Sequence, residues 1–224
     1  MKRRVKIQGF LIFLSLMFSI LLSKFLFPKW KRKILDEFLD AIGIVIVLSG
    51  FLLRISARGY KSEKSCEGKN LITDGPYGLM RHPMYFGTFL IGLGIIALLF
   101  NWWLLPLFLL IFLLIYVPQV HREEEKLSRQ FGSLYKVYSQ KTPKYFPKII
   151  SLFKLDFRDY LPFRWQYLKK EIISLIAVIS LIILIETWED VRAFGRIEYR
   201  EELLELFLII VSYFIVLTLL SKKD

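Results

Sequence analysis

The sequence predicts an all-α integral membrane protein, a bundle of about six transmembrane helices. Of its 224 residues, 55% are hydrophobic, and the mean hydropathy of +0.47 is too high for an ordinary soluble domain. The apolar residues are gathered in long uncharged blocks. Residues 83–120 carry no charged side chain over 38 positions. A single span needs about 20 residues, so this block alone holds two spans.

The middle of that block carries Asn101, Trp102 and Trp103. Asparagine favours turns, and tryptophan favours the interface between membrane and water. The block therefore predicts a helical hairpin, with one helix over 83–100 and the second over 104–120.

Four further apolar blocks predict the remaining spans, over residues 7–27, 34–55, 172–185 and 206–220. The first follows "MKRRVK" and resembles a signal peptide, but no small-residue cleavage site comes after it, so we interpret it as a membrane helix. The expected organisation is an N-terminal helix region (1–55), a central core (56–170) and a C-terminal helix pair (171–224).

The net charge of +12 comes from basic residues placed between the apolar blocks, as in cytoplasmic loops of membrane proteins. We therefore expect membrane lipids, not nucleic acid, as partners. The single cysteine, Cys66, excludes an internal disulfide. With only two histidines in the chain, no metal site is predicted.

Orientation follows from the basic residues. With the N-terminus inside, the inner segments hold 24 of the 32 lysines and arginines, which favours the cytoplasmic membrane with a cytosolic site. The stretch "PKWKRK" at 28–33 would then lie outside. This exception leaves open a re-entrant or interfacial course for the first two helices.

A hairpin returns its two ends to one side of the membrane, so "GPYGLMRHP" and "QVHREEEKL" should meet there. Taken singly, each of these residues could have a purely structural role, as part of a turn, as a helix cap or on a solvated charged face. Together they join carboxylates for an ammonium or sulfonium, Arg81 and His82 for a carboxylate, and Tyr77 and Tyr85 for a flat base or a cation. S-adenosylmethionine has all of these parts.

Two longer stretches, "NLITDGPYGLMRHPMYFGTFLIGLG" and "REEEKLSRQFGSLYKVYSQKTPKYFP", resemble the isoprenylcysteine carboxyl methyltransferase and phospholipid methyltransferase superfamily over residues 69–147. The resemblance implies a membrane helix bundle with a cytosolic S-adenosylmethionine pocket. It also implies that residues 141–147 cover the adenine end. The cofactor-binding positions it implies are Leu71, Ile72, Tyr77, His82, Pro83, Met84, Tyr85 and Glu123.

The acceptor is expected to be lipid-like, either an isoprenylcysteine carboxylate or a phospholipid headgroup. Gln119 stands where the eukaryotic carboxyl methyltransferases have an acceptor-facing arginine, which puts a prenylcysteine carboxylate in doubt. A carboxylate acceptor needs no base. An amine acceptor would need one, for which His82 and Glu124 are candidates.

Two other functions stay open. One is an NADPH-dependent membrane reductase of the sterol-reductase type, although Glu123 and Glu124 disfavour its extra phosphate. The other is a non-catalytic membrane scaffold of the same fold.

Overall fold

The computed structural model describes residues 33–99, 102–147, 160–162, 165–168, 171–194 and 211, and within these ranges all regular structure is helical. This confirms the all-α prediction for the described part of the chain. The predicted first span and, except for residue 211, the predicted sixth span lie outside the described residues. In chain order the elements are α3 (Lys33–Lys64), the 3₁₀-helix η1 (Cys66–Gly68), α4 (Pro76–Leu79), α5 (Pro83–Leu99), α6 (Leu104–Phe131), α7 (Ser133–Lys141), α10 (Trp165–Leu168) and α11 (Ile172–Phe194).

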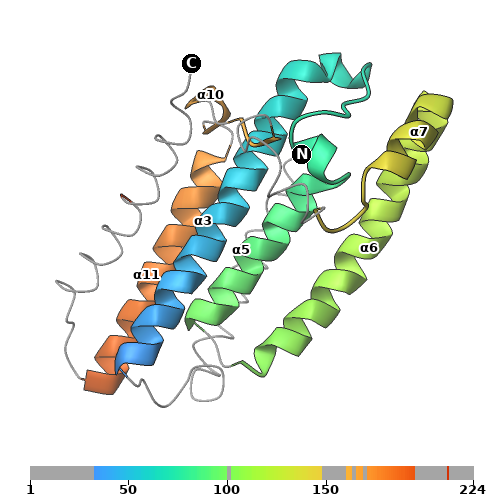
Figure 1. Ribbon diagram of the computed structural model, residues 1–224. Coiled ribbons are helices and arrows are strands. Elements are labelled where there is room, and N and C mark those ends of the chain that lie inside the picture. Colours follow the sequence, from blue (N-terminus) through green and yellow to red (C-terminus); the bar gives the residue numbers. More distant parts are fainter. Residues whose placement is uncertain are drawn as a thin grey trace, which may run out of the picture.

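Four long helices, α3, α5, α6 and α11, run along one common direction (Figure 1). The C-terminal ends of α3 and α6 and the N-terminal end of α5 lie at the same end, together with α4 and α7. We call this the polar end of the bundle. The predicted hairpin is confirmed as α5 and α6.

Helix α6 is longer than the hydropathy predicts, because it continues from Val120 to Phe131. A run without charges marks where an apolar layer ends, whereas a helix ends where its backbone is interrupted. Here the helix ends at Gly132, whose φ of 51° lies in the left-handed region that favours glycine. The second predicted helix is extended in the same way, to Lys64.

Within the described residues, two helical stretches are long and apolar enough to cross a membrane, Asp40–Lys64 and Leu104–Phe131. Shorter apolar helices cover Pro83–Leu98 and Ser174–Ile183. At 1.5 Å per residue, α6 is about 42 Å long, more than the roughly 30 Å hydrocarbon core. Its charge-free segment 104–120 is the part suited to lie in the membrane, and residues 121–131 would then project beyond it.

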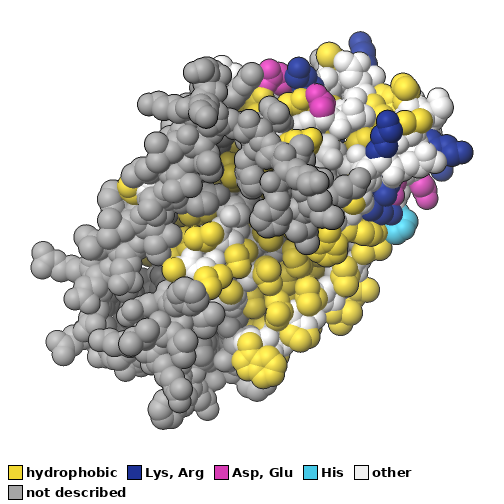
Figure 2. Space-filling model, in the orientation of Figure 1, with side chains coloured by type: hydrophobic (Ala, Val, Ile, Leu, Met, Phe, Trp, Pro, Cys, Tyr) yellow, Lys and Arg dark blue, Asp and Glu magenta, His cyan; other side chains and the backbone are white. Residues whose placement is uncertain are grey.

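Apolar and charged side chains occupy different parts of the surface. On the face shown in Figure 2, hydrophobic side chains cover a broad described area, and charged side chains gather at the polar end. Several α6 side chains are exposed, among them Leu113 at 55% and Leu114 at 67%. An exposed apolar helix face of this extent fits contact with lipid, and it indicates an integral membrane protein.

Helices α3 and α5 are held together by two pairs of glycines. A Cβ atom added to Gly50 would lie 2.7 Å from the carbonyl oxygen of Gly87, and one added to Gly94 would lie 2.7 Å from that of Gly43. The two glycines of α3 are seven residues apart, and so are the two glycines of α5. Both contacts therefore lie along the same face of each helix. Small residues at such positions let two membrane helices approach backbone to backbone.

Helix α11 is attached to α3 through a buried charge. Glu171 is fully buried at the start of α11 and accepts hydrogen bonds from Arg54, at 3.1 Å, and from Arg58, at 2.7 Å. Arg54 also donates to Thr88 of α5. Breaking a buried ion pair by removing one partner typically costs about 3–5 kcal/mol, so this contact fixes how the three helices are arranged.

Candidate functional site

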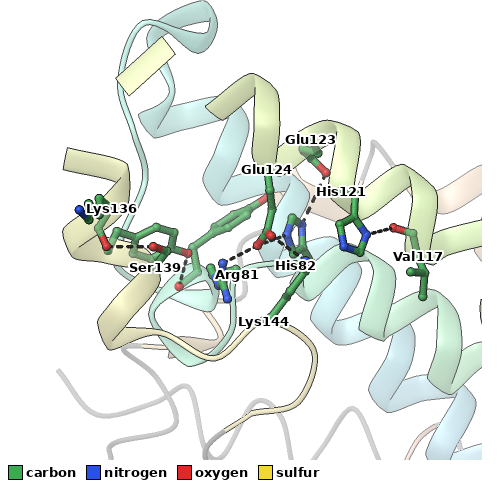
Figure 3. Close-up of polar contacts among 11 residues, drawn as sticks. Arg81, His82, Val117, His121, Glu123, Glu124, Lys136, Ser139 and Lys144 are labelled. Carbon is green, nitrogen blue, oxygen red and sulfur yellow. Dashed lines mark hydrogen bonds and ion pairs between the residues drawn. The ribbon is translucent and has the colours of Figure 1, made fainter. Parts of the chain in front are cut away.

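His82 lies at the centre of the polar end, immediately before α5, which begins at Pro83. Its side chain is buried. Nδ1 lies 3.6 Å from Oε2 of Glu123, and Nε2 lies 3.4 Å from Oε1 of Glu124 (Figure 3). The imidazole is therefore bracketed by two neighbouring carboxylates of α6. The two motif segments are in direct contact, as the hairpin predicts.

The carboxylate of Glu124 contacts three basic side chains. Its Oε1 accepts a hydrogen bond from Nη1 of Arg81 at 2.5 Å, and its Oε2 lies 2.7 Å from Nζ of Lys144. His82 is the third partner. The backbone N–H of Arg81 also donates to the carbonyl of Pro143 at 2.9 Å. Glu124 thus joins the loop before α5, helix α6 and the segment after α7, and both of its oxygens are engaged.

Glu123 is held more loosely than its neighbour. Its side chain is 30% exposed, and Nζ of Lys61 is 3.6 Å away. The hydrogen bond from His82 lowers the pKa of Glu123 to about 2. Tyr85 also forms a hydrogen bond with Glu123. The carboxylate is therefore ionised at neutral pH and still partly accessible, which suits the binding of a cation.

Helix α7 is joined to α4 by a hydrogen bond at the edge of this cluster. The hydroxyl of Tyr138 donates to the backbone carbonyl of Tyr77 at 2.7 Å. Burial raises the pKa of both Tyr77 and Tyr138 far above the usual range, so both phenols stay neutral. This contact fixes the "GPYG" turn in which Tyr77 lies.

The remaining sequence-predicted positions surround the cluster without joining its ion pairs. Leu71 and Ile72 are half-buried in the loop before α4, Pro83 is buried, and Met84 is half-buried in the first turn of α5. Gln119 is exposed on α6 and forms a side-chain hydrogen bond with Tyr85. The structure therefore brings together His82, Tyr85, Glu123 and Glu124, with Gln119 at their margin.

Sequence reasoning did not single out Lys61 or Lys144. Lys61 lies in the last turn of α3, far from the glutamates in sequence, and Lys144 lies in the irregular segment after α7. The only sequence feature that pointed to such lysines was the acidic run at 123–125, because partly buried carboxylates need cationic partners.

A continuous run of aromatic rings leads from the cluster into the apolar part of the hairpin. Tyr85 contacts Tyr116 edge-on at 5.4 Å, and Tyr116 stacks on Phe112 at 4.2 Å between ring centroids. Phe112 in turn contacts Phe89 at 5.2 Å and Phe108 at 5.7 Å. We call these rings the aromatic ladder. It connects the polar end to the apolar layer along the α5–α6 interface.

Part of the chain matches a known protein family. Residues 38–133 match the model of the phospholipid methyltransferase family. The matched region begins within α3, includes the whole α5–α6 hairpin and ends just after α6. The match and the relatives named below confirm the predicted superfamily, isoprenylcysteine carboxyl methyltransferases and phospholipid methyltransferases, for this part of the chain.

Individual relatives agree with that class. The chain is 38% identical to a protein-S-isoprenylcysteine O-methyltransferase of Schizosaccharomyces pombe over 79 residues, which is 35% of this chain and 34% of the relative. It is 33% identical to the protein of the same name from Xenopus laevis over 124 residues, 50% of this chain and 41% of the relative.

A third relative carries a different kind of name. The chain is 32% identical to the nickel-cobalt-cadmium resistance protein NccN of Alcaligenes xylosoxydans xylosoxydans over 129 residues, 57% of this chain and 58% of the relative. In the part of this chain that the structure describes, no group of three or more His, Cys, Asp or Glu side chains is arranged to hold a metal ion. The chain spans less than two thirds of the length of each of these relatives, and no solved structure matches it.

Proposed function

We propose that the protein is an integral membrane methyltransferase that moves a methyl group from S-adenosylmethionine to a lipid-like acceptor. The observation that carries the proposal is the partly exposed, ionised carboxylate of Glu123 beside His82 and Tyr85, at the membrane surface. The superfamily match of residues 38–133 supports the same reaction class.

The residues of the polar end fit this cofactor. Glu123 offers a carboxylate to an ammonium or sulfonium, and the Tyr85 ring beside it offers an aromatic face to a cation. Leu71, Ile72 and Met84 offer half-buried apolar surface for the adenine. S-adenosylmethionine would supply an activated methyl group on its sulfonium. The protein must then align the acceptor and exclude water, because methyl transfer from a sulfonium is an in-line displacement.

Glu124 is better suited to hold the site together than to accept a proton. Its two oxygens are already engaged by Arg81, His82 and Lys144. If the acceptor is an amine, His82 remains the candidate base. A carboxylate acceptor requires none.

The aromatic ladder supports entry of the acceptor from the bilayer. A hydrophobic chain lying along Phe89, Phe108 and Phe112 would have its head at Tyr85 and Gln119. The acceptor class remains an isoprenylcysteine carboxylate or a phospholipid headgroup. The proposal includes the six-span bundle, the cytoplasmic membrane and the cytosolic orientation of the polar end, supported by the distribution of basic residues.

The test compares two glutamates that are two residues apart on α6. Glu123→Gln removes the charge proposed to bind the cofactor, whereas Glu125→Gln removes an exposed charge whose partner is Arg129. S-Adenosylmethionine and NADPH binding to the full chain in detergent would be measured by calorimetry. We expect Glu123→Gln to weaken S-adenosylmethionine binding by roughly 1–3 kcal/mol, His82→Ala to do the same, and Glu125→Gln to have no effect.

Binding of NADPH instead of S-adenosylmethionine would favour the reductase. Binding of neither would favour the scaffold. Unchanged S-adenosylmethionine affinity in both Glu123→Gln and His82→Ala would reject this placement of the site.

A further inference from the structure

We propose that the outer face of α6 carries a binding site for an anionic phospholipid, separate from the polar cluster around His82. A shallow, open hollow of about 380 Å³ lies on this face, lined by five exposed side chains of α6: Arg122, Glu125, Lys126, Arg129 and Gln130. None of these five side chains is part of the proposed cofactor site.

The charge of the hollow favours an anion. Three lining residues are basic and one is acidic, a balance of +2. Glu125 is 3.7 Å from Arg129, but both side chains are largely exposed, at 69% and 84%, and such surface pairs are weak. Within the described part of the chain, Arg122 and Lys126 form no ion pair with a carboxylate. A phosphate oxygen would therefore meet two uncompensated cations.

The depth of the hollow matches a lipid headgroup. Val120 is the last residue of the charge-free segment. Arg122 lies about 3 Å beyond it along the helix and Lys126 about 9 Å beyond it, at 1.5 Å per residue. The headgroup layer on each side of the hydrocarbon is about 5–8 Å thick. The two cations thus bracket the level at which lipid phosphates lie.

The same face of α6 continues into the apolar layer. At about 100° per residue, Ile111 and Ile115 lie within roughly 20° of Arg122 around the helix axis. Their side chains are 47% and 59% exposed. An acyl chain can lie along these two residues while the phosphate occupies the hollow above them. This combination of basic hollow and apolar strip distinguishes a lipid from a soluble anion.

The face points away from the proposed cofactor cluster. Glu124 and the buried Val120 lie about 160–200° from Arg122 around the axis of α6. At the edge of the hollow, Nε2 of Gln130 donates to the carbonyl of Gly68 at 2.6 Å and so ties the loop after α3 to this side of α6. A lipid bound here would contact the outside of the hairpin.

Native mass spectrometry tests the proposal on the full chain, purified in detergent and mixed with equal amounts of phosphatidylglycerol and phosphatidylcholine. Each basic side chain near the membrane surface contributes a preference of about fivefold for anionic lipid. We expect wild type to retain phosphatidylglycerol preferentially, Lys126→Gln to reduce the preference about fivefold, and the triple variant with Arg122→Gln and Arg129→Gln to lose it. The matched control is Lys136→Gln, an exposed lysine on α7, which should leave the preference unchanged.

Equal retention of the two lipids by wild type, or a preference that survives in the triple variant, would overturn the proposal. Competition by millimolar inorganic phosphate would reassign the hollow to a soluble anion. A dimer that is lost in the triple variant would reassign it to a second copy of the chain. Methyl transfer is not measured, so the outcome does not depend on the proposed enzymatic function.

Discussion

Gly50 of α3 and Gly87 of α5 lie backbone to backbone, so close that a Cβ atom on either would stand 2.7 Å from the carbonyl oxygen of the other. Gly50→Ala should therefore force the two helices apart. We expect a loss of about 1–3 kcal/mol, the usual range for overpacking a tight contact. The measurement is the apparent Tm in detergent, followed by tryptophan fluorescence.

Ala97→Val is a suitable control for that change, because it adds bulk at an exposed position of α5. It should leave the Tm within the error of wild type. If Gly50→Ala and Ala97→Val behaved alike, the close approach of α3 and α5 would be refuted.

The ion pair between Lys144 and Glu124 should hold the segment after α7 against the polar cluster. Lys144→Gln removes a 2.7 Å contact between side chains that are only 20% and 16% exposed. We expect the affinity for S-adenosylmethionine to fall by roughly tenfold, about 1.4 kcal/mol, mainly through faster dissociation. Stopped-flow release of a fluorescent cofactor analogue measures the rate.

Lys136→Gln serves as the control here too, because Lys136 is an exposed lysine on α7. A release rate unchanged by Lys144→Gln would show that residues 142–147 do not retain the cofactor. Combining Lys144→Gln with Glu124→Gln should give less than the sum of the two single effects, because both variants remove the same contact.

Cys66 reports the side of the membrane on which the polar end lies. It is a free, exposed thiol in the loop after α3 and the only cysteine of the chain. With the N-terminus inside, an impermeant maleimide should label it only after the cells are permeabilised. A variant with Cys66→Ser and Trp102→Cys places the thiol at the hairpin turn, where the side chain is 84% exposed, and should be labelled in intact cells. The reverse pattern would invert the orientation.

Gln119 should limit the use of carboxylate acceptors. It hydrogen-bonds with Tyr85, one turn before Glu123, but a neutral amide cannot pair bidentately with a carboxylate as arginine does. We expect little activity on a prenylcysteine analogue with a free carboxylate. Gln119→Arg should raise it by about 10–100-fold, since a charge-assisted hydrogen bond contributes about 1.5–3 kcal/mol.

Transfer of labelled methyl groups measures this activity, and Gln130→Arg, about 16 Å further along α6, is the control. Cofactor affinity should be the same in wild type and both variants. Robust turnover of the analogue by wild type would make carboxyl methylation the leading function.

The hairpin was predictable because a charge-free block twice as long as one span has few other ways to fold in a membrane. The contact of His82 with Glu123 and Glu124 followed from that hairpin, since both ends return to one side. The length of α6 could not be predicted in this way. Hydropathy shows which residues are apolar enough to lie in lipid, but it does not show where a helix ends. Whether the other predicted cofactor positions bind S-adenosylmethionine stays a prediction.

The long-range contacts were not predictable in the same way. The Gly43–Gly94 and Gly50–Gly87 pairs repeat every seven residues on both helices, but each glycine alone is ordinary in a membrane helix, and the sequence does not say which helix it faces. Lys61 and Lys144 are likewise separated from the glutamates by segments whose path the sequence does not define. Such pairings depend on how the helices are arranged in three dimensions, which local composition does not encode.

The fully buried Glu171 lies 117 residues after Arg54, its partner on α3. Chains are synthesised from the N-terminus at about 5–20 residues per second. Glu171 is therefore synthesised roughly 6–23 seconds after Arg54. During that time the guanidinium remains at the membrane surface or with the insertion machinery, because an unpaired cation is costly within the bilayer. Docking of α11 on α3 can therefore be completed only after Glu171 is made, and a nascent chain that stops before Glu171 should be a substrate for membrane quality control.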